Sequence, residues 1–241
     1  LEGNNIVSPP PEILTRGVSA IVGYMREMDS AWWTRELDIS GQRFTAVPLE
    51  VCEIDSLTSL SLHSQSFDFI PENIGRLTSL TLLNLQHCSL VELPDGIGLL
   101  RSLKELILNN NRLIFLPHHI GSCTNLTHLR LHENLLEDLP KAIGRLTLMQ
   151  DLRLFNNNIL QLPVELGFMK FLPSFRISSN QLASLPIGIG GLESVTDLLL
   201  SDNFLESLPP QIGLLTSITR LRASSNRLQE LPDELGNLWS M

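Results

Sequence analysis

The sequence has few aromatic residues, few cysteines and no long hydrophobic run. Of its 241 residues 43% are hydrophobic, but only 5% are aromatic. Any core must therefore be built from aliphatic side chains rather than from a few large rings. No apolar stretch approaches the roughly 20 residues that a membrane-spanning helix requires, so the sequence predicts no membrane span.

The chain also lacks an excess of basic residues. It has 17 lysines and arginines against 26 aspartates and glutamates, for a net charge of −9. Binding to phosphate backbones requires a basic surface, so we expect no nucleic-acid partner.

Only three cysteines are present, Cys52, Cys88 and Cys123, and they are far apart in the sequence. Sparse, unpaired thiols are typical of a reducing compartment, and we expect a cytoplasmic protein. The alternative of an extracellular protein stays open, because Asn125-Leu126-Thr127 is a glycosylation sequon.

What the sequence does contain is a 23-residue repeat. Proline recurs at this spacing from Pro48 to Pro232, and glycine from Gly75 to Gly236. The first strand leucine of each repeat, replaced once by phenylalanine, lies at Leu37, Leu60, Leu83, Leu106, Leu129, Leu152, Phe175, Leu198 and Leu221. This period with the pattern L-x-x-L-x-L-x-x-N-x-L is the signature of a leucine-rich repeat, whose single units cannot bury their own apolar face.

Each repeat predicts the same succession of elements. A short strand such as Leu129 to Leu131 points its leucines inward and its alternate residues outward. A segment such as Leu139 to Leu146, with proline suited to the start of a helical turn, packs Ile143 and Leu146 inward. The predicted fold is therefore an α/β leucine-rich repeat solenoid. It is a right-handed arc with a parallel sheet on the concave face and short helical turns on the convex face.

Asparagines at one position of the repeat should form an internal hydrogen-bonded ladder. They are Asn111, Asn134, Asn157, Asn180, Asn203 and Asn226. Earlier repeats have Gln42, Gln65 and Cys88 at this position, and we expect a looser ladder there. The repeated glycine should permit close contact between stacked coils.

The segment before Thr34 breaks the register of the repeat. We expect residues 1–13 to end a preceding repeat, residues 14–33 to form a helical interruption or cap, and residues 34–241 to form nine repeats that are truncated at the C-terminal end. The apolar residues that follow helical spacing are Val18, Ile21, Val22, Met25 and Met28. One of Trp32 and Trp33 is expected to pack over the edge of the first repeat, and the alternative is a contact with another domain.

The unit Leu-Pro-x-x-Ile-Gly-x-Leu, seen at residues 139–146, resembles the Ras-group leucine-rich repeats of Ras-binding scaffolds, scribble-type polarity proteins and plant intracellular relatives. The resemblance covers residues 37–241. It implies binding of another protein on the concave face, such as a small GTPase, a kinase or a phosphatase. It implies no particular binding residue.

The outward strand positions predict a mixed-charge concave surface in the second half of the array. Its central row contains Arg130, Arg153, Arg176 and Arg222, and arginine is enriched at protein interfaces. The candidate partner-binding residues are Arg130, His132, Asp151, Arg153, Phe155, Arg176, Asp197, Phe204, Arg220 and Arg222. The alternative is a solvated face on which arginines and aspartates pair across adjacent strands.

No catalytic motif, cofactor motif or metal motif is recognisable. The glycines recur singly rather than in a phosphate-binding loop. His63, His87, His128 and His132 are spread over several repeats, whereas zinc requires about four convergent ligands. His118 and His119 should be solvated on the outer turn. We expect neither a metal nor a cofactor nor enzyme activity in these residues.

These observations favour a protein-interaction scaffold that binds a folded signalling protein. The alternatives are a regulatory array within a larger multidomain enzyme and, less favoured, an extracellular receptor ectodomain. The oligomeric state and the identity of the partner stay open.

Overall fold

Nine short parallel strands, one from each repeat, form a single sheet in sequence order in the computed structural model, which describes residues 8–238. Neighbouring strands pair with an offset of one repeat, as in Leu37 with Leu60 and Leu129 with Leu152. The strands are β1 (Glu36–Asp38), β2 (Ser59–Ser61), β3 (Leu82–Asn84), β4 (Glu105–Ile107), β5 (His128–Arg130), β6 (Asp151–Arg153), β7 (Ser174–Arg176), β8 (Asp197–Leu199) and β9 (Arg220–Arg222). The repeat period alone therefore fixes the sheet register.

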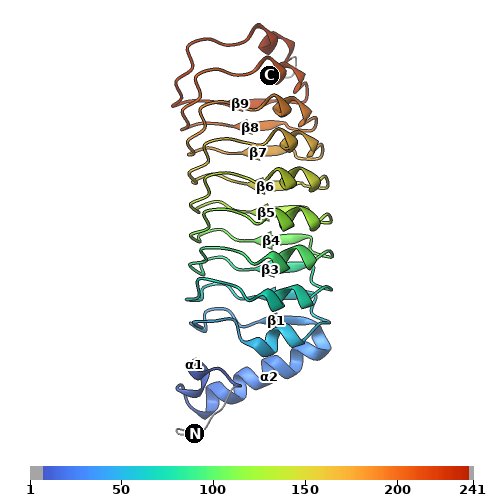
Figure 1. The fold of residues 1–241 in the computed structure, drawn as a ribbon, viewed down its shortest axis with the longest axis vertical. Helices are drawn as coiled ribbons and strands as arrows, with labels where there is room; N and C mark the ends of the chain where they lie inside the picture. The colour runs from blue at the N-terminus through green and yellow to red at the C-terminus, as the bar shows by residue number, and fades with distance from the viewer. Residues whose placement is uncertain (1–7, 239–241) are drawn as a thin grey trace.

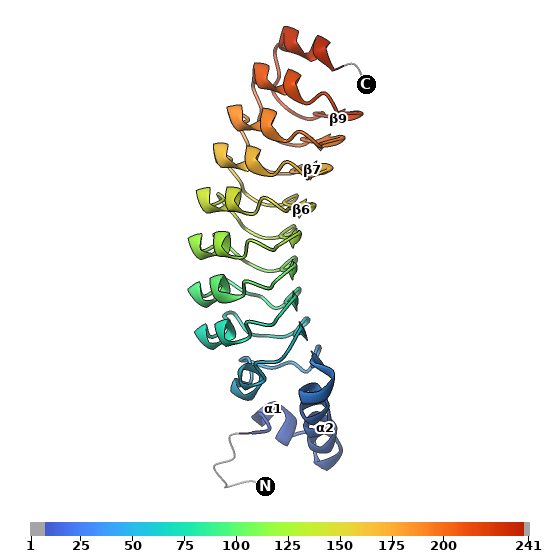
Figure 2. The same ribbon diagram turned by 90° about the vertical axis from the view of Figure 1, so that its right-hand side faces the viewer.

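A 3-10 helix of five residues faces each strand across the core. These helices are η1 (Leu49–Glu53), η2 (Glu72–Arg76), η3 (Asp95–Leu99), η4 (His118–Ser122), η5 (Lys141–Arg145), η6 (Val164–Phe168), η7 (Ile187–Gly191), η8 (Pro210–Leu214) and η9 (Asp233–Asn237). The repeated proline lies immediately before each helix, where its fixed φ suits the turn. Figure 2 shows the helices along the convex side of the stack and the strands along the concave side, which confirms the predicted solenoid.

The core is a column of leucines and isoleucines between these two walls. Leu129, Leu131, Ile143 and Leu146 are fully buried, as the repeat predicts. At Gly144, an added Cβ would lie 2.4 Å from the Glu165 carbonyl oxygen of the next coil. The glycine is therefore required because the coils are in backbone contact at this position.

The asparagine ladder forms as expected. Asn134 Oδ1 accepts from the amide of Leu113, and its Nδ2 donates to the carbonyl oxygens of Leu108 and Leu131. Asn134 is 6% exposed, so these bonds satisfy backbone groups that water does not reach.

The three residues that replace the ladder asparagine in the first repeats, Gln42, Gln65 and Cys88, make different hydrogen bonds. Gln65 accepts from the amide of Phe44 and donates to the Ile39 carbonyl oxygen, which is two bonds where the Asn134 side chain makes four, so the ladder is looser there, as expected. The Cys88 thiol only donates, to the Leu62 and Gln86 carbonyl oxygens, as expected of a weaker partner. Gln42 leaves the ladder and accepts from Arg16.

Helices α1 (Pro11–Leu14) and α2 (Val18–Thr34) cover the N-terminal end of the stack (Figure 1). Tyr24 and Ala31 are buried there, and the Tyr24 ring packs edge-on against Phe44 with 6.1 Å between ring centroids. Most of the expected remnant of an earlier repeat, residues 1–7, lies outside the described residues.

The expected apolar face of α2 is partly wrong. Ile21 and Met28 pack against the core, but Val18, Val22 and Met25 are exposed, because the buried face runs through Tyr24 and Ala31 instead. The expected packing of one tryptophan over the first repeat is met only in part. Trp33 is 83% exposed, whereas Trp32 is half-buried and lines a hollow with Glu50 and Glu53 of that repeat. The small Ala31 is the residue that is fully buried there.

Candidate functional site

The concave face presents three rows of side chains, from the first and third residues of each strand and from the residue two positions beyond. The rows at β5 and β6 begin with His128 and Asp151, continue with Arg130 and Arg153, and end with His132 and Phe155. Strand pleating explains the rows, because the intervening leucines point into the core.

Two of the predicted arginines are held by carboxylates. The Arg130 guanidinium lies 3.0 Å from Glu105 Oε1 and 3.6 Å from Asp151 Oδ2. Arg153 Nε donates to both carboxylate oxygens of Asp151 at 3.0 Å. At these two strands the concave face is a network of ion pairs, as the alternative interpretation predicted.

Two other arginines are free of carboxylates within residues 8–238. Arg176 is exposed and donates only to Ser174 Oγ, at 3.2 Å. Arg222 is exposed at the end of β9, and Arg220 on the same strand lies 3.1 Å from Asp197 Oδ1. The available positive charge therefore lies at β7 and β9.

Two aromatic rings lie next to the paired arginines Arg130 and Arg153. The His132 ring stacks on Phe155 with 4.5 Å between centroids. Burial lowers the pKa of His132, and Arg153 and Arg130 lower it further against the opposing effect of Glu133, so the imidazole is neutral at pH 7. A neutral stacked ring adds an apolar surface beside the arginines.

Phe204 does not lie in the row of Phe155. It belongs to the turn beyond β8, where the Arg227 guanidinium covers its ring at 4.4 Å from the centroid. The structure thus separates the ten predicted residues into two groups. Arg130, His132, Asp151, Arg153 and Phe155 lie together on β5 and β6 or just beyond them, with Arg176 adjacent on β7. Asp197, Arg220 and Arg222 lie on β8 and β9, with Phe204 in the turn.

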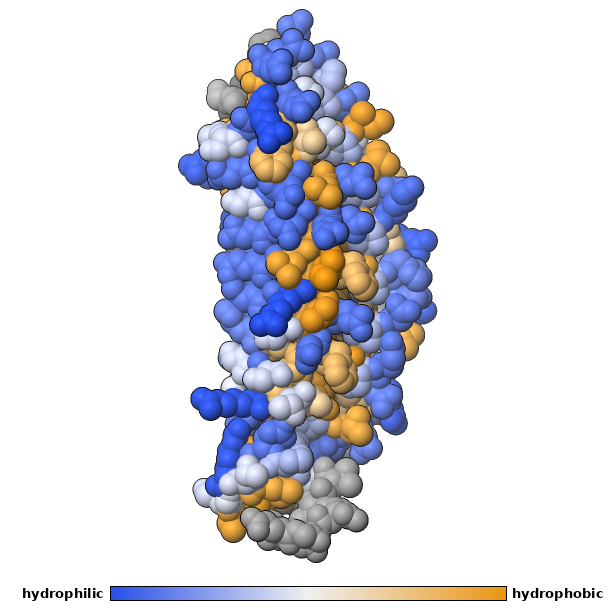
Figure 3. Space-filling view, turned by 60° about the vertical axis from the view of Figure 1, so that its left-hand side comes forward, coloured by the Kyte–Doolittle hydropathy of each residue, from blue (hydrophilic) through white to orange (hydrophobic). Residues whose placement is uncertain are grey.

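A strip of exposed apolar residues lies on the flank of the solenoid where the chain leaves the strands, and it was not predicted from the sequence. Its exposed residues follow the strands of the second to sixth repeats: Phe69, Val91, Ile114, Phe115, Leu135 and Leu160. Figure 3 shows hydrophobic residues gathered along the middle of this flank. The repeat alignment contains the signal, because Val91, Ile114 and Leu160 share one position of the unit.

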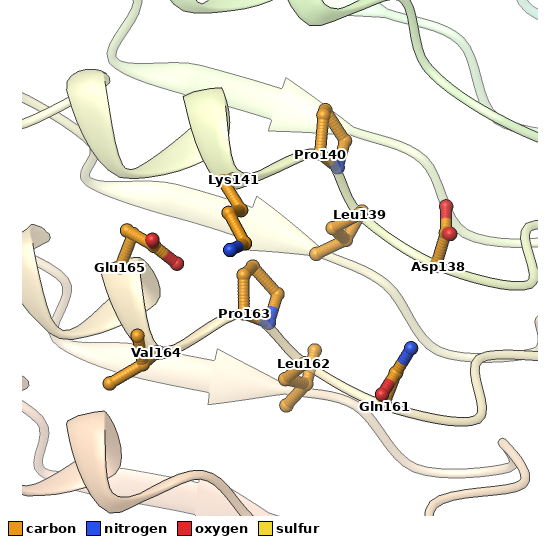
Figure 4. A pocket seen from close by; sticks show the side chains of 9 residues that line it. All are labelled: Asp138, Leu139, Pro140, Lys141, Gln161, Leu162, Pro163, Val164 and Glu165. Carbon is orange, nitrogen blue, oxygen red and sulfur yellow. The ribbon is translucent and has the colours of Figure 1, made fainter.

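A hollow of about 470 Å³ lies between two successive coils (Figure 4). The Leu-Pro pairs of two successive repeats, Leu139-Pro140 and Leu162-Pro163, form its middle. Asp138 and Gln161 lie at one end, and Lys141 and Glu165 at the other. No predicted site residue lines this hollow.

One group of side chains within residues 8–238 has the composition of a metal site. Asp95, His118 and His119 bring their ligand atoms within 4.8 Å of one another. They belong to η3 and η4 on the convex side, far from the histidines of the concave rows. The two histidines were expected to be solvated on the outer turn, and Asp95 was not considered with them. A separation of one full repeat between Asp95 and His118 places these residues side by side.

All three cysteines are free and buried. Burial raises the pKa of each thiol to about 11. None therefore provides a reactive thiolate at neutral pH.

Comparison with protein families and solved structures identifies the fold. Two leucine rich repeat family models match residues 79–100 and residues 101–159. A leucine-rich repeat protein of Leptospira interrogans is 30% identical, with a TM-score of 0.75, over 88% of this chain and 61% of that one. The comparison with curated protein sequences found no match.

Two further similar structures are receptor complexes. The plant peptide hormone receptor RGFR1 in complex with RGF2 is 30% identical, with a TM-score of 0.61, over 81% of this chain and 36% of the receptor. The Toll–Spatzle complex of Drosophila is 26% identical, with a TM-score of 0.71, over 83% of this chain and 27% of that one. The chain thus spans less than two thirds of the length of these proteins.

The strand register, the asparagine ladder and these matches define the chain as a leucine-rich repeat solenoid. This fold is typically a non-enzymatic scaffold for protein–protein interaction. No helix in residues 8–238 is long and apolar enough to cross a membrane.

Proposed function

We propose that this solenoid is a cytoplasmic scaffold of the Ras-group type, which binds a folded signalling protein on its concave face. The partner class is a small GTPase, a kinase or a phosphatase. One observation carries the proposal: Arg176 and Arg222 are exposed on the concave sheet, with no carboxylate partner within residues 8–238. A guanidinium left open in this way is suited to a carboxylate of an acidic protein surface.

The surroundings of these arginines support a protein partner. The stacked pair His132 and Phe155, just beyond β5 and β6, and Phe204, in the turn beyond β8, add apolar area to the same half of the solenoid. Aromatic and arginine side chains together are the residues that most often dominate binding energy at interfaces. A sheet held by nine stacked repeats loses little conformational entropy when it binds.

The test compares two double variants by affinity purification from cytosolic extract, followed by mass spectrometry. Arg176→Glu with Arg222→Glu reverses the two unpaired charges on the concave face. Arg76→Glu with Arg145→Glu makes the same change in charge at exposed positions of η2 and η5. We expect the first variant to lose the partner, at least about tenfold in recovery, and the second to keep it.

Circular dichroism of both variants establishes that the sheet is intact before the comparison. Equal recovery of every protein by the two variants would contradict binding through these arginines. Recovery of a partner that is not a signalling protein would contradict the proposed class.

A second candidate is an extracellular receptor ectodomain, because the receptors RGFR1 and Toll have similar solenoids. Two observations favour the cytoplasm. The three cysteines are buried and unpaired, and the Asn125 side-chain nitrogen, which a glycan would occupy, donates to the Arg101 carbonyl oxygen at 2.7 Å. Glycan at Asn125 of the protein from its native cells would favour the ectodomain.

A regulatory array within a larger enzyme would be indicated by a catalytic domain in the same reading frame.

A further inference from the structure

We propose that Asp95, His118 and His119 form a binding site for a divalent transition-metal cation, of the class of Zn²⁺, on the convex side of the solenoid. The site is independent of the proposed partner-binding face. It lies between the first residue of η3 and the first two residues of η4.

The repeat itself creates the juxtaposition. Asp95 and His118 are one full repeat apart, so they occupy the same position in successive coils, immediately after the repeated proline. The coils are in backbone contact here, since a Cβ at Gly98 would lie 2.6 Å from the His119 carbonyl oxygen. The ligand atoms of all three side chains consequently lie within 4.8 Å of one another.

The Nδ1 atom of His119 is placed where it could bind a cation. Its Nδ1 is shielded from solvent and lies 2.8 Å from Asp95 Oδ1, yet it makes no hydrogen bond of normal geometry. The His118 ring lies against the His119 ring, with 3.7 Å between centroids. Two imidazoles and one carboxylate thus gather, and within residues 8–238 the His119 Nδ1 has no neighbour to bind other than the Asp95 carboxylate.

The neighbouring coils limit the site to these three ligands. Glu72 occupies the same position one coil earlier, but its carboxylate accepts from the amides of Asp95 and Gly96 at 3.2 and 2.7 Å. Lys141 occupies this position one coil later and brings a positive charge. Water would complete the coordination, as it does where zinc has three protein ligands.

The donor set selects the class of metal. Imidazole nitrogen suits Zn²⁺, Cu²⁺, Ni²⁺ and Co²⁺, whereas Mg²⁺ and Ca²⁺ prefer sites made only of oxygen. Zinc requires bond lengths of roughly 2 Å, so binding requires the three side chains, whose ligand atoms lie within 4.8 Å of one another, to converge on the ion. The bound ion would join the third and fourth repeats.

The experiment is calorimetric titration of the untagged chain with Zn²⁺, and with Co²⁺ as a spectroscopic probe. We expect one site per chain, a visible Co²⁺ absorption typical of nitrogen and oxygen ligands, and no competition from excess Mg²⁺. Asp95→Ala and His118→Asn should each weaken binding at least roughly tenfold. The matched control, His63→Asn with His87→Asn, removes two histidines from the other side and should leave the affinity unchanged.

A second readout is urea unfolding. Zn²⁺ should raise the unfolding midpoint of the unsubstituted chain and not that of Asp95→Ala, because only the native state assembles the three ligands. Absence of Zn²⁺ binding by the unsubstituted chain overturns the proposal. Binding that survives both variants, or that is lost in the control, overturns it as well, since the ion then binds elsewhere.

Discussion

At the scale of single residues, each ladder asparagine bonds to the backbone of two successive coils. Asn157 Oδ1 accepts from the Leu136 amide, and Nδ2 donates to the carbonyl oxygens of Leu131 and Leu154, each at 3.0 Å. Without this side chain the Leu136 amide would be buried without a partner, and the carbonyl oxygens of Leu131 and Leu154 would keep only their bonds from Asn134 and Asn180. One side chain thus connects two successive repeats.

Asn157→Ala should destabilise the protein by about 3 kcal/mol, because it strands a buried amide and reduces the bonding of two carbonyl groups. Urea unfolding followed by circular dichroism measures this change. The matched control is Asn73→Ala, at an exposed position of η2, with an expected effect within about 0.5 kcal/mol. Equal destabilisation by the two substitutions would refute the role of the ladder.

The cysteines give a second prediction at this scale. Because the folded chain raises the pKa of Cys88 and Cys123 to about 11, almost no thiolate is present at pH 8, and burial also blocks access. Iodoacetamide should label none of the three cysteines at pH 8 in the native protein and all three in concentrated urea. Rapid labelling of the native protein, read by mass spectrometry, would contradict the packing of these thiols.

At the scale of the repeating element, the backbone contact at glycine sets how tightly the coils stack. Gly144→Ala would place a Cβ 2.4 Å from the Glu165 carbonyl oxygen, so the coils must separate. We expect a loss of about 1–3 kcal/mol in stability, as in other overpacked sites. Gly236→Ala is the matched control at the same repeat position, since nothing lies within 4 Å of its Cβ. Thermal melts of the two variants should differ by several degrees, and identical melting temperatures would show that the coils separate at no cost.

The repeat explains how much of the fold the sequence predicts. Leucine, proline and glycine at a fixed period determine strand register, helix position and coil contact, because each has one physical role in every unit. The orientation of α2 lies outside this period, and helical spacing alone does not choose between the face of Val18 and Met25 and the face of Tyr24 and Ala31. Packing against Phe44 makes that choice.

The sequence predicts where the candidate surface lies, but it does not predict which of its arginines are paired with carboxylates. Strand alternation places Arg130, Arg153 and Arg176 on the concave face. Which of them is neutralised depends on side-chain geometry, since Asp151 reaches both Arg130 and Arg153 but not Arg176. The prediction that Phe204 lies on the same face as Phe155 was wrong, because the alternation of side chains ends with the strand and Phe204 lies in the turn that follows. In the turns beyond β6 and β8 the backbone is left-handed, with φ of 56° at Asn156 and 59° at Asp202.

At the scale of the whole molecule, stability should vary along the stack. In a solenoid each repeat is stabilised by its neighbours, so stability is a sum of unit and interface contributions. The fifth repeat is covered on both sides, and Leu129, Leu131 and Leu136 are fully buried. Their equivalents in the ninth repeat, Leu221, Ala223 and Leu228, are only partly buried.

Hydrogen exchange should therefore be slow at β5 and fast at β9. The Leu131 amide donates to the Arg153 carbonyl oxygen at 2.9 Å, whereas the Ala223 amide has no backbone partner within residues 8–238. Exchange followed by mass spectrometry should give a protection factor at Leu131 that is at least about 100-fold greater than at Ala223, since a difference of roughly 3 kcal/mol in opening free energy separates covered from frayed segments. At the other end α2 covers β1, so Leu37 should exchange more slowly than Leu221. Uniform protection along the stack would mean that the nine repeats open only as one unit, and the additive description of this solenoid would be wrong.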